Sequence, residues 1–345
     1  MAMLRWAIVG PGRHSNNKMA PAITSASNAG LAAVVSRDLG RARDFSKRHT
    51  EGRATAYDSY DAMLRDSSVD AVYIASPNAL HAEQTLKAAQ AGKHVLCEKP
   101  MALTMEDCRR MVEGCQRHNV RLGVCFHLRH HPGHQEMREM LRSGTIGEVA
   151  LAQAQFAGGV RGQTEPPPRS ELQRWWEDPD LVGAGAFMGS GVHAVDLLRY
   201  LLGQEVVQVA ALTDGQRPER PLEHVATLLL RFRGGALATV HSSRRIPDPR
   251  NDVVLYGSLG RLACYGSVST TLMGELEVVS QSLTRHESYG PHDTAMYRGM
   301  VEAFGQCVER GEEPSASGWD GLKVAQVTLA MLESQRTGRT VTLGP

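Results

Sequence analysis

Short apolar, β-branched runs alternate with amphipathic stretches of helical spacing over the first 126 residues. This alternation is typical of a parallel sheet whose strands are joined by crossover helices. It predicts strands at Trp6–Val9, Leu31–Ser36, Ala71–Ala75, Val95–Cys97 and Leu122–Phe126. Helices are predicted at Leu80–Ala91, before Gly92, and at Thr104–His118, with Thr104 as its N-cap. Residues 1–126 are therefore predicted to form an α/β domain with a doubly wound parallel sheet of the Rossmann type.

The pattern changes after residue 126. A short helix is expected from Pro132 to Ser143, and longer alternating runs follow. These runs predict strands, the first two forming a hairpin, at Val225–Phe232, Ala236–Ser242, Val253–Tyr256, Arg261–Tyr265 and Leu276–Val279. Helices are predicted at Val192–Leu202, Asp293–Arg310 and Gly318–Ser334, and residues 158–174 are expected to form a mobile loop. Residues 127–345 are therefore predicted to be an α+β domain with a mostly antiparallel sheet.

Composition and charge narrow the class of function. The 38 Lys and Arg residues balance 37 Asp and Glu residues, and no long basic run offers a surface for nucleic acid or anionic lipid. No run of about 18 apolar residues predicts a membrane span. The six cysteines include no C-x-x-C pair, as expected for reduced thiols. We therefore expect a cytoplasmic protein that binds a small molecule, without nucleic-acid or membrane partners.

A glycine motif follows the first predicted strand. The run Gly10-Pro11-Gly12-Arg13-His14-Ser15 matches G-x-G-x-x-G with serine at the third small position. The first glycine allows a tight turn, the second lets the backbone approach a pyrophosphate, and the helix N-terminus supplies N–H donors. The alternative is a Gly-rich turn without a ligand, but the alternating context favours a dinucleotide site formed by Gly10, Gly12, Arg13 and His14.

The end of the second predicted strand bears on the choice of cofactor. A carboxylate at this point binds the free ribose 2′-hydroxyl of NAD, whereas a hydroxyl followed by a guanidinium accommodates the 2′-phosphate of NADP. Ser36 and Arg37 therefore favour NADP. NAD stays possible because Asp38 follows, and the alternative for Arg37 is a solvated loop cation.

Two further runs carry a family resemblance. They are Ala75-Ser76-Pro77-Asn78-Ala79-Leu80-His81 and Gly92-Lys93-His94-Val95-Leu96-Cys97-Glu98-Lys99-Pro100. They resemble the Gfo/Idh/MocA family, named for glucose–fructose oxidoreductase and inositol dehydrogenase, in which similar motifs flank the nicotinamide, and the likeness extends over nearly the whole chain. The resemblance implies cofactor contacts by Ser76, Asn78, His81 and Glu98. It also implies that Lys99 reaches the nicotinamide ribose and the substrate hydroxyl.

Within these runs, Glu98 would balance the charge of Lys99, and Pro100 would fix the turn, through a cis bond. His81 is open to two interpretations. It either caps its helix beside the cofactor or faces solvent.

A third block, Gly183-Ala184-Gly185-Ala186-Phe187-Met188-Gly189-Ser190-Gly191-Val192-His193, resembles the family's G-G-G-x-x-x-D-x-G-x-H. His193 takes the place of the catalytic histidine. An imidazole with an ordinary pKa near 6.5 can accept an alcohol proton and return it. The family's aspartate falls on Gly189, so either another group substitutes for it or the substrate differs.

A histidine-rich run, His127-Leu128-Arg129-His130-His131-Pro132-Gly133-His134, follows the last strand of the first domain. The resemblance makes Arg129 and His127 expected substrate contacts. No Asp or Cys in the run completes an evident ligand set, so no metal is predicted. Trp175 either stacks on a sugar ring or packs at a domain interface.

Together these features predict an NADP(H)-dependent dehydrogenase or reductase. It would transfer hydride between the nicotinamide and a secondary alcohol or carbonyl of a sugar, sugar derivative or cyclitol, with Lys99 and His193 as catalytic residues. Two alternatives share the motifs: a non-catalytic NADP-binding sensor or partner protein, and glycoside cleavage through transient oxidation. The family resemblance also implies a homo-oligomer, a dimer or a tetramer, formed through the antiparallel sheet.

Overall fold

The computed structural model describes residues 3–344, and the chain divides into two compact units. The first unit comprises Met1–Cys125 and Asp293–Leu322, and the second comprises Phe126–His292 and Lys323–Pro345. This differs from the division at residue 126 expected from the sequence, which leaves residues 293–322 in the second domain. The reason is a helix that packs on the core of the first unit, described below.

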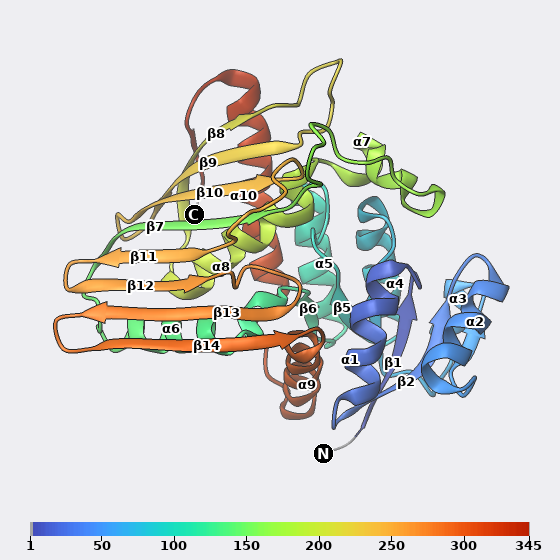
Figure 1. Cartoon of the computed structure of the whole chain (residues 1–345). Helices are drawn as coiled ribbons and strands as arrows, with labels where there is room; N and C mark the ends of the chain where they lie inside the picture. Colours follow the sequence, from blue (N-terminus) through green and yellow to red (C-terminus); the bar gives the residue numbers. More distant parts are fainter. Residues whose placement is uncertain (1–2, 345) are drawn as a thin grey trace. The chain divides into compact units, whose positions relative to one another are not determined.

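The first unit contains a six-stranded sheet in the order β3-β2-β1-β4-β5-β6, with every strand pair parallel (Figure 1). Its strands are β1 (Leu4–Val9), β2 (Ala29–Val35), β3 (Thr55–Tyr57), β4 (Ala71–Ile74), β5 (His94–Cys97) and β6 (Leu122–Val124). Its helices are α1 (Ala20–Ser25), α2 (Leu39–Thr50), α3 (Tyr60–Leu64), α4 (His81–Gln90), α5 (Met105–Arg117) and α9 (Ala295–Arg310). The predicted doubly wound parallel sheet is confirmed.

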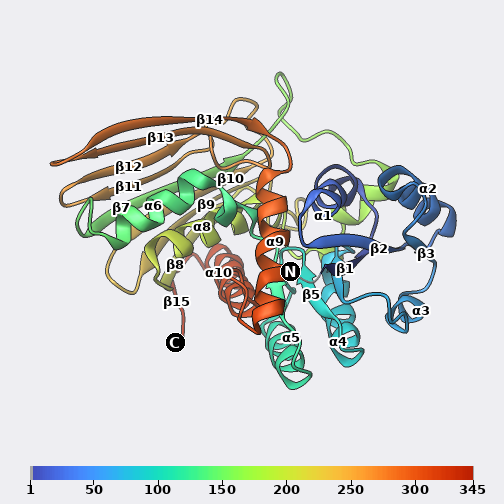
Figure 2. The same ribbon diagram turned by 90° about the horizontal axis from the view of Figure 1, so that it is seen from below.

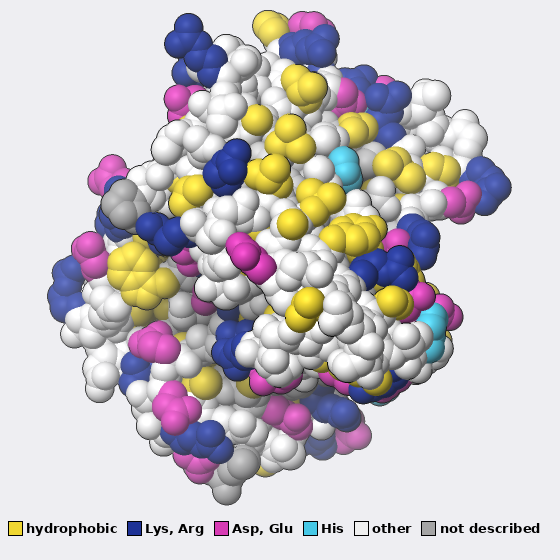
Figure 3. Space-filling model, turned by 90° about the vertical axis from the view of Figure 1, so that its left-hand side faces the viewer, with side chains coloured by type: hydrophobic (Ala, Val, Ile, Leu, Met, Phe, Trp, Pro, Cys, Tyr) yellow, Lys and Arg dark blue, Asp and Glu magenta, His cyan; other side chains and the backbone are white. Residues whose placement is uncertain are grey.

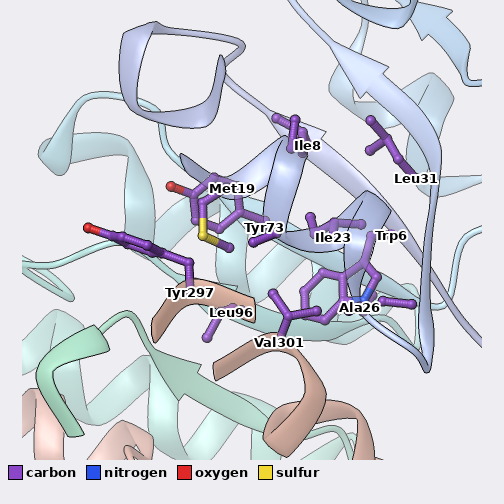
Figure 4. Close-up of a cluster of buried hydrophobic side chains, with 14 of the residues drawn as sticks. Trp6, Ile8, Met19, Ile23, Ala26, Leu31, Tyr73, Leu96, Tyr297 and Val301 are labelled. Atoms are coloured by element: carbon purple, nitrogen blue, oxygen red, sulfur yellow. The ribbon is translucent and has the colours of Figure 1, made fainter. Parts of the chain in front are cut away.

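The core of the first unit is completed by α9. Trp6 of β1 is fully buried, and its ring lies 5.3 Å from the ring of Phe304. Tyr297 and Val301 of the same helix lie in this cluster together with Ile23 of α1 (Figure 4). Burial of large apolar and aromatic side chains is the main favourable term in folding, so residues 293–310 belong to this unit by packing.

The second unit contains a nine-stranded sheet in the order β14-β13-β12-β11-β7-β10-β9-β8-β15. Only β10 and β7 are parallel neighbours, so the predicted antiparallel character is confirmed. The strands are β7 (Val149–Ala157), β8 (Val206–Thr213), β9 (Val225–Phe232), β10 (Leu237–Ser243), β11 (Val253–Gly257), β12 (Gly260–Tyr265), β13 (Leu272–Ser280), β14 (Thr284–His292) and β15 (Val341–Thr342).

Helices cover one face of this sheet. They are α6 (Pro132–Arg142) and α8 (Val192–Leu202), which lie along the same side in Figure 2. Short helical segments η3 (His127–His130), η4 (Glu171–Glu177), α7 (Pro179–Val182) and η5 (Phe187–Gly191) complete the unit, and α10 (Gly318–Thr337) runs across the division between the units. Residues 158–170, in the segment predicted as a loop, contain no helix or strand.

The opposite face of the large sheet leaves apolar side chains exposed. Leu229 is 60% exposed, and Leu151, Leu237 and Tyr256 are each about 40% exposed. Leu151 of β7 is the cross-strand partner of both Leu237 and Tyr256, so these three side chains form one continuous row. An apolar row of this kind on an antiparallel sheet is typical of an association surface.

Residues 179–202 form a helical stretch that is long and apolar enough, by length and composition, to cross a bilayer. However, 72% of its most apolar window is buried inside the protein, as expected for a core helix. On the face drawn in Figure 3, basic and acidic side chains are interspersed, in keeping with the net charge of +1.

Candidate functional site

The turn after β1 has the geometry that a dinucleotide requires. Gly10 has a φ of +89°, and a Cβ atom on it would lie 2.7 Å from the carbonyl oxygen of Ala75. A Cβ on Gly12 would meet nothing within 4 Å, so this stretch of backbone is open to a ligand. The hydroxyl of Ser15 donates to the Gly10 carbonyl at 2.7 Å, which ties the helix start to the turn. The open backbone beside a helix N-terminus fits a pyrophosphate.

At the end of β2, the contacts of Asp38 differ from those of Ser36 and Arg37. The Asp38 carboxylate accepts a hydrogen bond from the backbone N–H of Arg41 at 3.1 Å and so caps α2. Ser36 is 8% exposed, and its hydroxyl lies 3.3 Å from the Asp38 amide nitrogen. Arg37 is exposed. One oxygen of the carboxylate that could bind a free ribose hydroxyl is thus engaged as a helix cap.

His81 links the two family motifs. Its ring nitrogens lie 2.9 Å from the carbonyl oxygen of Pro100 and 3.0 Å from that of Ser76. Burial lowers the pKa of His81 despite both carbonyls, and a neutral imidazole can donate to only one of them at a time. His81 is fully buried and Asn78 is 2% exposed, so the solvent-facing alternative for His81 is wrong. The Lys99–Pro100 peptide bond is cis, as expected.

Glu98 is the centre of a polar cluster at the carboxyl end of β5. It accepts from the Tyr73 hydroxyl at 2.8 Å and from the backbone N–H of Lys99 at 3.2 Å, and His14 Nε2 lies 3.4 Å away. Burial acts to raise the pKa of Glu98, but His14, Lys99 and the Tyr73 hydroxyl outweigh it and the pKa is lowered. Burial lowers the pKa of Lys99, whereas the Glu98 carboxylate acts to raise it. The Tyr297 ring lies edge-on to His14 at 5.3 Å. Glu98 therefore partly balances the Lys99 charge, as expected.

In the second unit, a buried carboxylate holds the glycine-rich segment. Glu223 accepts hydrogen bonds from the backbone N–H groups of Gly185 at 2.8 Å and Phe187 at 2.9 Å, and from the side-chain amide of Gln216 at 2.8 Å. Its own carbonyl accepts from Ala186 at 2.8 Å. A Cβ on Gly185 would lie 1.9 Å from that carbonyl oxygen, so only glycine fits there. Glu223 thus fixes the start of the segment that leads into α8.

His193 lies at the start of α8 in an aromatic environment. It is 4% exposed, and its ring centroid lies 4.6 Å from that of His127, 5.8 Å from that of Phe156 and 6.1 Å from that of Phe126. The ring plane of His127 is nearly perpendicular to that of His193. His127 Nε2 donates to the carbonyl of Ser269 at 3.0 Å, since a carbonyl can only accept. The two histidines singled out in the sequence are therefore brought together.

Arg129, which is expected from the sequence to contact the substrate, forms a buried ion pair. Its Nε and one Nη donate to the carboxylate of Asp196 at 2.8 and 2.5 Å. Arg129 is 5% exposed and Asp196 is 1% exposed. Removing one partner of such a buried pair leaves an uncompensated charge, so the pair holds α8 against η3.

Three other predicted positions, Gly189, Trp175 and Arg13, are less constrained. A Cβ on Gly189 would meet nothing within 4 Å, so the place of the family's aspartate is open space. Trp175 stacks on Trp176, with ring centroids 4.4 Å apart. Arg13 of the glycine motif is exposed.

In the folded chain, a cysteine lies beside two histidines of the histidine-rich run. His131, His134 and Cys264 are buried, and their possible ligand atoms lie within 4.8 Å of one another. Each ring nitrogen already has a partner: His131 contacts the Met273 carbonyl and the Gly133 N–H, and His134 contacts the Leu128 carbonyl and the Ser267 hydroxyl. The two rings lie 4.5 Å apart and are tilted by 31° to each other. This arrangement is explained by hydrogen bonding within the protein.

Two family models match two successive parts of the chain. Residues 4–126 match the family described as an oxidoreductase family with an NAD-binding Rossmann fold, and residues 134–263 match the GFO/IDH/MocA C-terminal domain. The chain is 30% identical to 1,5-anhydro-D-fructose reductase of Ensifer adhaerens over 98% of both chains. The chain belongs to the Gfo/Idh/MocA family. It is accordingly an NAD(P)-dependent oxidoreductase.

Other similar proteins match this chain over nearly its full length. The chain is 32% identical to D-xylose 1-dehydrogenase (NADP(+)) 2 of Haloferax volcanii, covering 99% of this chain and 100% of that one. The solved structure of aldose–aldose oxidoreductase from Caulobacter crescentus has a TM-score of 0.86 and 27% identity, covering 99% of this chain and 100% of that chain.

Sequence reasoning missed several groups around these sites. Tyr73, Tyr297, Asp196 and Glu223 were not singled out, although each contacts a predicted site residue or its segment. Tyr73 lies inside β4 and Tyr297 inside α9, where an aromatic residue is usually core. Glu223 gave the one usable signal, an acidic residue two positions before an apolar strand.

Proposed function

We propose that this Gfo/Idh/MocA protein uses NADP(H) to interconvert a secondary alcohol and a carbonyl on a sugar, sugar derivative or cyclitol. The observation that carries the proposal is the Glu98–Lys99 cluster at the carboxyl end of β5, beside the Gly10 turn. In open α/β sheets this edge binds the ligand. The substrate class is supported by the names of the similar proteins, which act on an anhydro sugar and on xylose.

The residues of the first unit fit a bound dinucleotide, and NADP is the proposed choice. The open backbone at Gly12 and the helix after it would receive the pyrophosphate. Ser36 and the exposed Arg37 would receive a 2′-phosphate, while Asp38 is held as a helix cap. When bound, the nicotinamide supplies or accepts the hydride.

Lys99 and His193 are the proposed catalytic residues. The Lys99 ammonium would bind the reacting oxygen, and burial lowers the pKa of this group, which makes its proton easier to give up. His193 would accept the alcohol proton and return it, with His127 beside its ring as a proposed substrate contact. Trp175 keeps its proposed role of stacking on a sugar ring.

Self-association through the uncovered sheet face is also proposed. The exposed row of Leu151, Leu237 and Tyr256 is apolar and continuous, and a second copy would remove it from water. We further propose a cytoplasmic location, which suits six cysteines without a disulfide.

The test is turnover of a panel of neutral, acidic and phosphorylated sugars and cyclitols with NADP⁺ and NAD⁺, followed at the NADPH absorbance. Lys99→Ala and His193→Ala are expected to lower kcat by roughly 10²–10⁴ and leave the NADPH Kd within a few-fold. A protein that binds NADPH but turns over no substrate, with products checked for cleaved glycosides, would contradict the proposal. A nearly normal kcat in either variant would remove that residue from the catalytic set.

A further inference from the structure

The strand register of the second unit places an arginine near His193. In β10, Ser242 is the parallel partner of Phe156, whose ring lies against His193. The backbone pairing continues one residue past β10, because the N–H of Arg244 donates to the carbonyl of His224 at 2.8 Å. Side chains two residues apart on a strand share a face, so Arg244 lies on the same face as Ser242. That face is the one against which η5 and α8 pack.

The same face carries a buried hydroxyl that lacks a partner. Ser242 is 1% exposed, and its Oγ has no hydrogen-bond partner among residues 3–344. A buried hydroxyl without a partner costs free energy, so it indicates a group that arrives from outside the protein. Gly189 lies in η5, which packs on β10, and the space beside it is open. The face next to His193 thus combines free volume with an unused donor.

A second arginine lies close to the first. The guanidinium of Arg169 lies 5.2 Å from the Trp176 ring, and its backbone N–H donates to the carboxylate of Glu177 at 3.1 Å. Burial lowers the pKa of Arg169 to about 10, and the positive charge of Arg244 contributes to this lowering. The two cations therefore interact. Burial also lowers the pKa of Arg244.

These two arginines differ from their neighbours in lacking ion pairs. Within the described part of the chain, neither Arg169 nor Arg244 has a carboxylate oxygen within 4.0 Å of its guanidinium. Arg245, the next residue, pairs with Asp214 at 3.1 Å, and Asp214 also pairs with Arg220. The Glu177 carboxylate acts to raise the pKa of both arginines, so one negative charge is shared between two cations. The positive charge that is left over favours an anion, because guanidinium forks match carboxylate and phosphate oxygens.

We propose that Arg169 and Arg244 bind a carboxylate or phosphate group of the substrate, so that the enzyme acts on an acidic sugar derivative. This inference rests on the proposed function, because it names the substrate class of the same site. The Ser242 hydroxyl donates to the sugar next to that anionic group. Gly189 fits this assignment, since an aspartate there would add negative charge beside an anionic substrate.

The experiment compares three probes of similar size: D-glucuronate, D-glucose 6-phosphate and neutral D-glucose. Each is assayed for turnover with NADP⁺ and, separately, for binding to the NADPH-loaded protein by intrinsic tryptophan fluorescence. The variants are Arg244→Gln and Arg169→Gln. Arg245→Gln is the matched control, because its guanidinium is already paired with Asp214.

We expect the wild type to prefer one anionic probe to D-glucose by at least about 10-fold. Each test variant should lower kcat/KM or affinity for that probe by about 10- to 100-fold, the range for a charge-assisted hydrogen bond, and change D-glucose by less than about threefold. The control should stay within about threefold for all probes. The preferred anionic probe identifies the group as carboxylate or phosphate.

Three results would overturn the inference: no preference for either anionic probe in both assays, an equal loss for D-glucose in the test variants, or an equal loss in the control. Arginine-dependent binding of an anionic probe without turnover of any substrate would support the anion site. It would at the same time contradict the proposed oxidoreductase activity on these sugars.

Discussion

Replacing Glu223 by glutamine tests whether this one carboxylate holds the glycine-rich segment. The side chain is fully buried and accepts three hydrogen bonds, two of them from backbone N–H groups at 2.8 and 2.9 Å. Glutamine keeps the shape but places an amide NH₂ against a donor, so at least one backbone N–H loses its acceptor. A hydrogen bond to a charged group contributes about 1.5–3 kcal/mol, and a buried N–H without a partner costs about 1–3 kcal/mol. Glu223→Gln should therefore lower the free energy of unfolding by about 2–4 kcal/mol.

The assay is urea unfolding at pH 7.5, with Glu219→Gln as the control. Glu219 lies in the same connection between β8 and β9 but is exposed, so its replacement should change the free energy by less than about 0.5 kcal/mol. The Glu223 variant should also lose kcat, because the segment that it holds leads to His193, while NADPH affinity stays within a few-fold. If the free energy of unfolding of Glu223→Gln lies within about 0.5 kcal/mol of the wild-type value, at about 95% confidence in the fit, the reasoning is refuted.

Arg37→Ala should raise the NADPH Kd by about 10- to 100-fold and leave the NADH Kd nearly unchanged, as measured by fluorescence titration; equal NADPH and NADH affinities in the wild type would reject the 2′-phosphate role. Gly189→Ala should stabilise the protein by about 0.5–1 kcal/mol in urea, because the added Cβ meets nothing within 4 Å in a helical segment; destabilisation would show that this space is not free. Burial lowers the pKa of His134 and, to a smaller extent, of His131, so below pH 6.5 the unfolded chain binds protons that the folded chain does not. The free energy of unfolding should therefore fall by up to about 1.4 kcal/mol per pH unit for each histidine as the pH is lowered. A urea midpoint that is flat between pH 7 and pH 5 would contradict this.

Five of the six parallel strands could be predicted because they are mostly buried and apolar. Strand β3 could not be predicted, since none of its three residues is buried. Strand β7 could not, since its run Val149–Ala157 contains four alanines and two glutamines and has little β preference. Strand β14 lies at the edge of its sheet, and none of its residues is buried, so no apolar alternation marks it.

The candidate site shows the same limit. Motif residues such as Gly10, Glu98 and Lys99 are visible because the chemistry needs them at fixed spacing. Asp196, by contrast, looks like any polar residue on an apolar helix until Arg129 is placed beside it. Partners that meet across about 70 residues depend on tertiary packing, which no local pattern records.

The return of α9 to the first unit sets an order in time for a chain made from its N-terminus. About 170 residues of the second unit lie between Cys125 and Asp293. At synthesis rates of about 5–20 residues per second, roughly 10–40 s pass between the appearance of the first segment and that of the last residues of its unit. During that interval Trp6 lacks its contact with the ring of Phe304, which lies beside it in the folded protein. Strands β7 to β14 of the second unit are therefore able to pair while the nascent Rossmann unit still lacks α9.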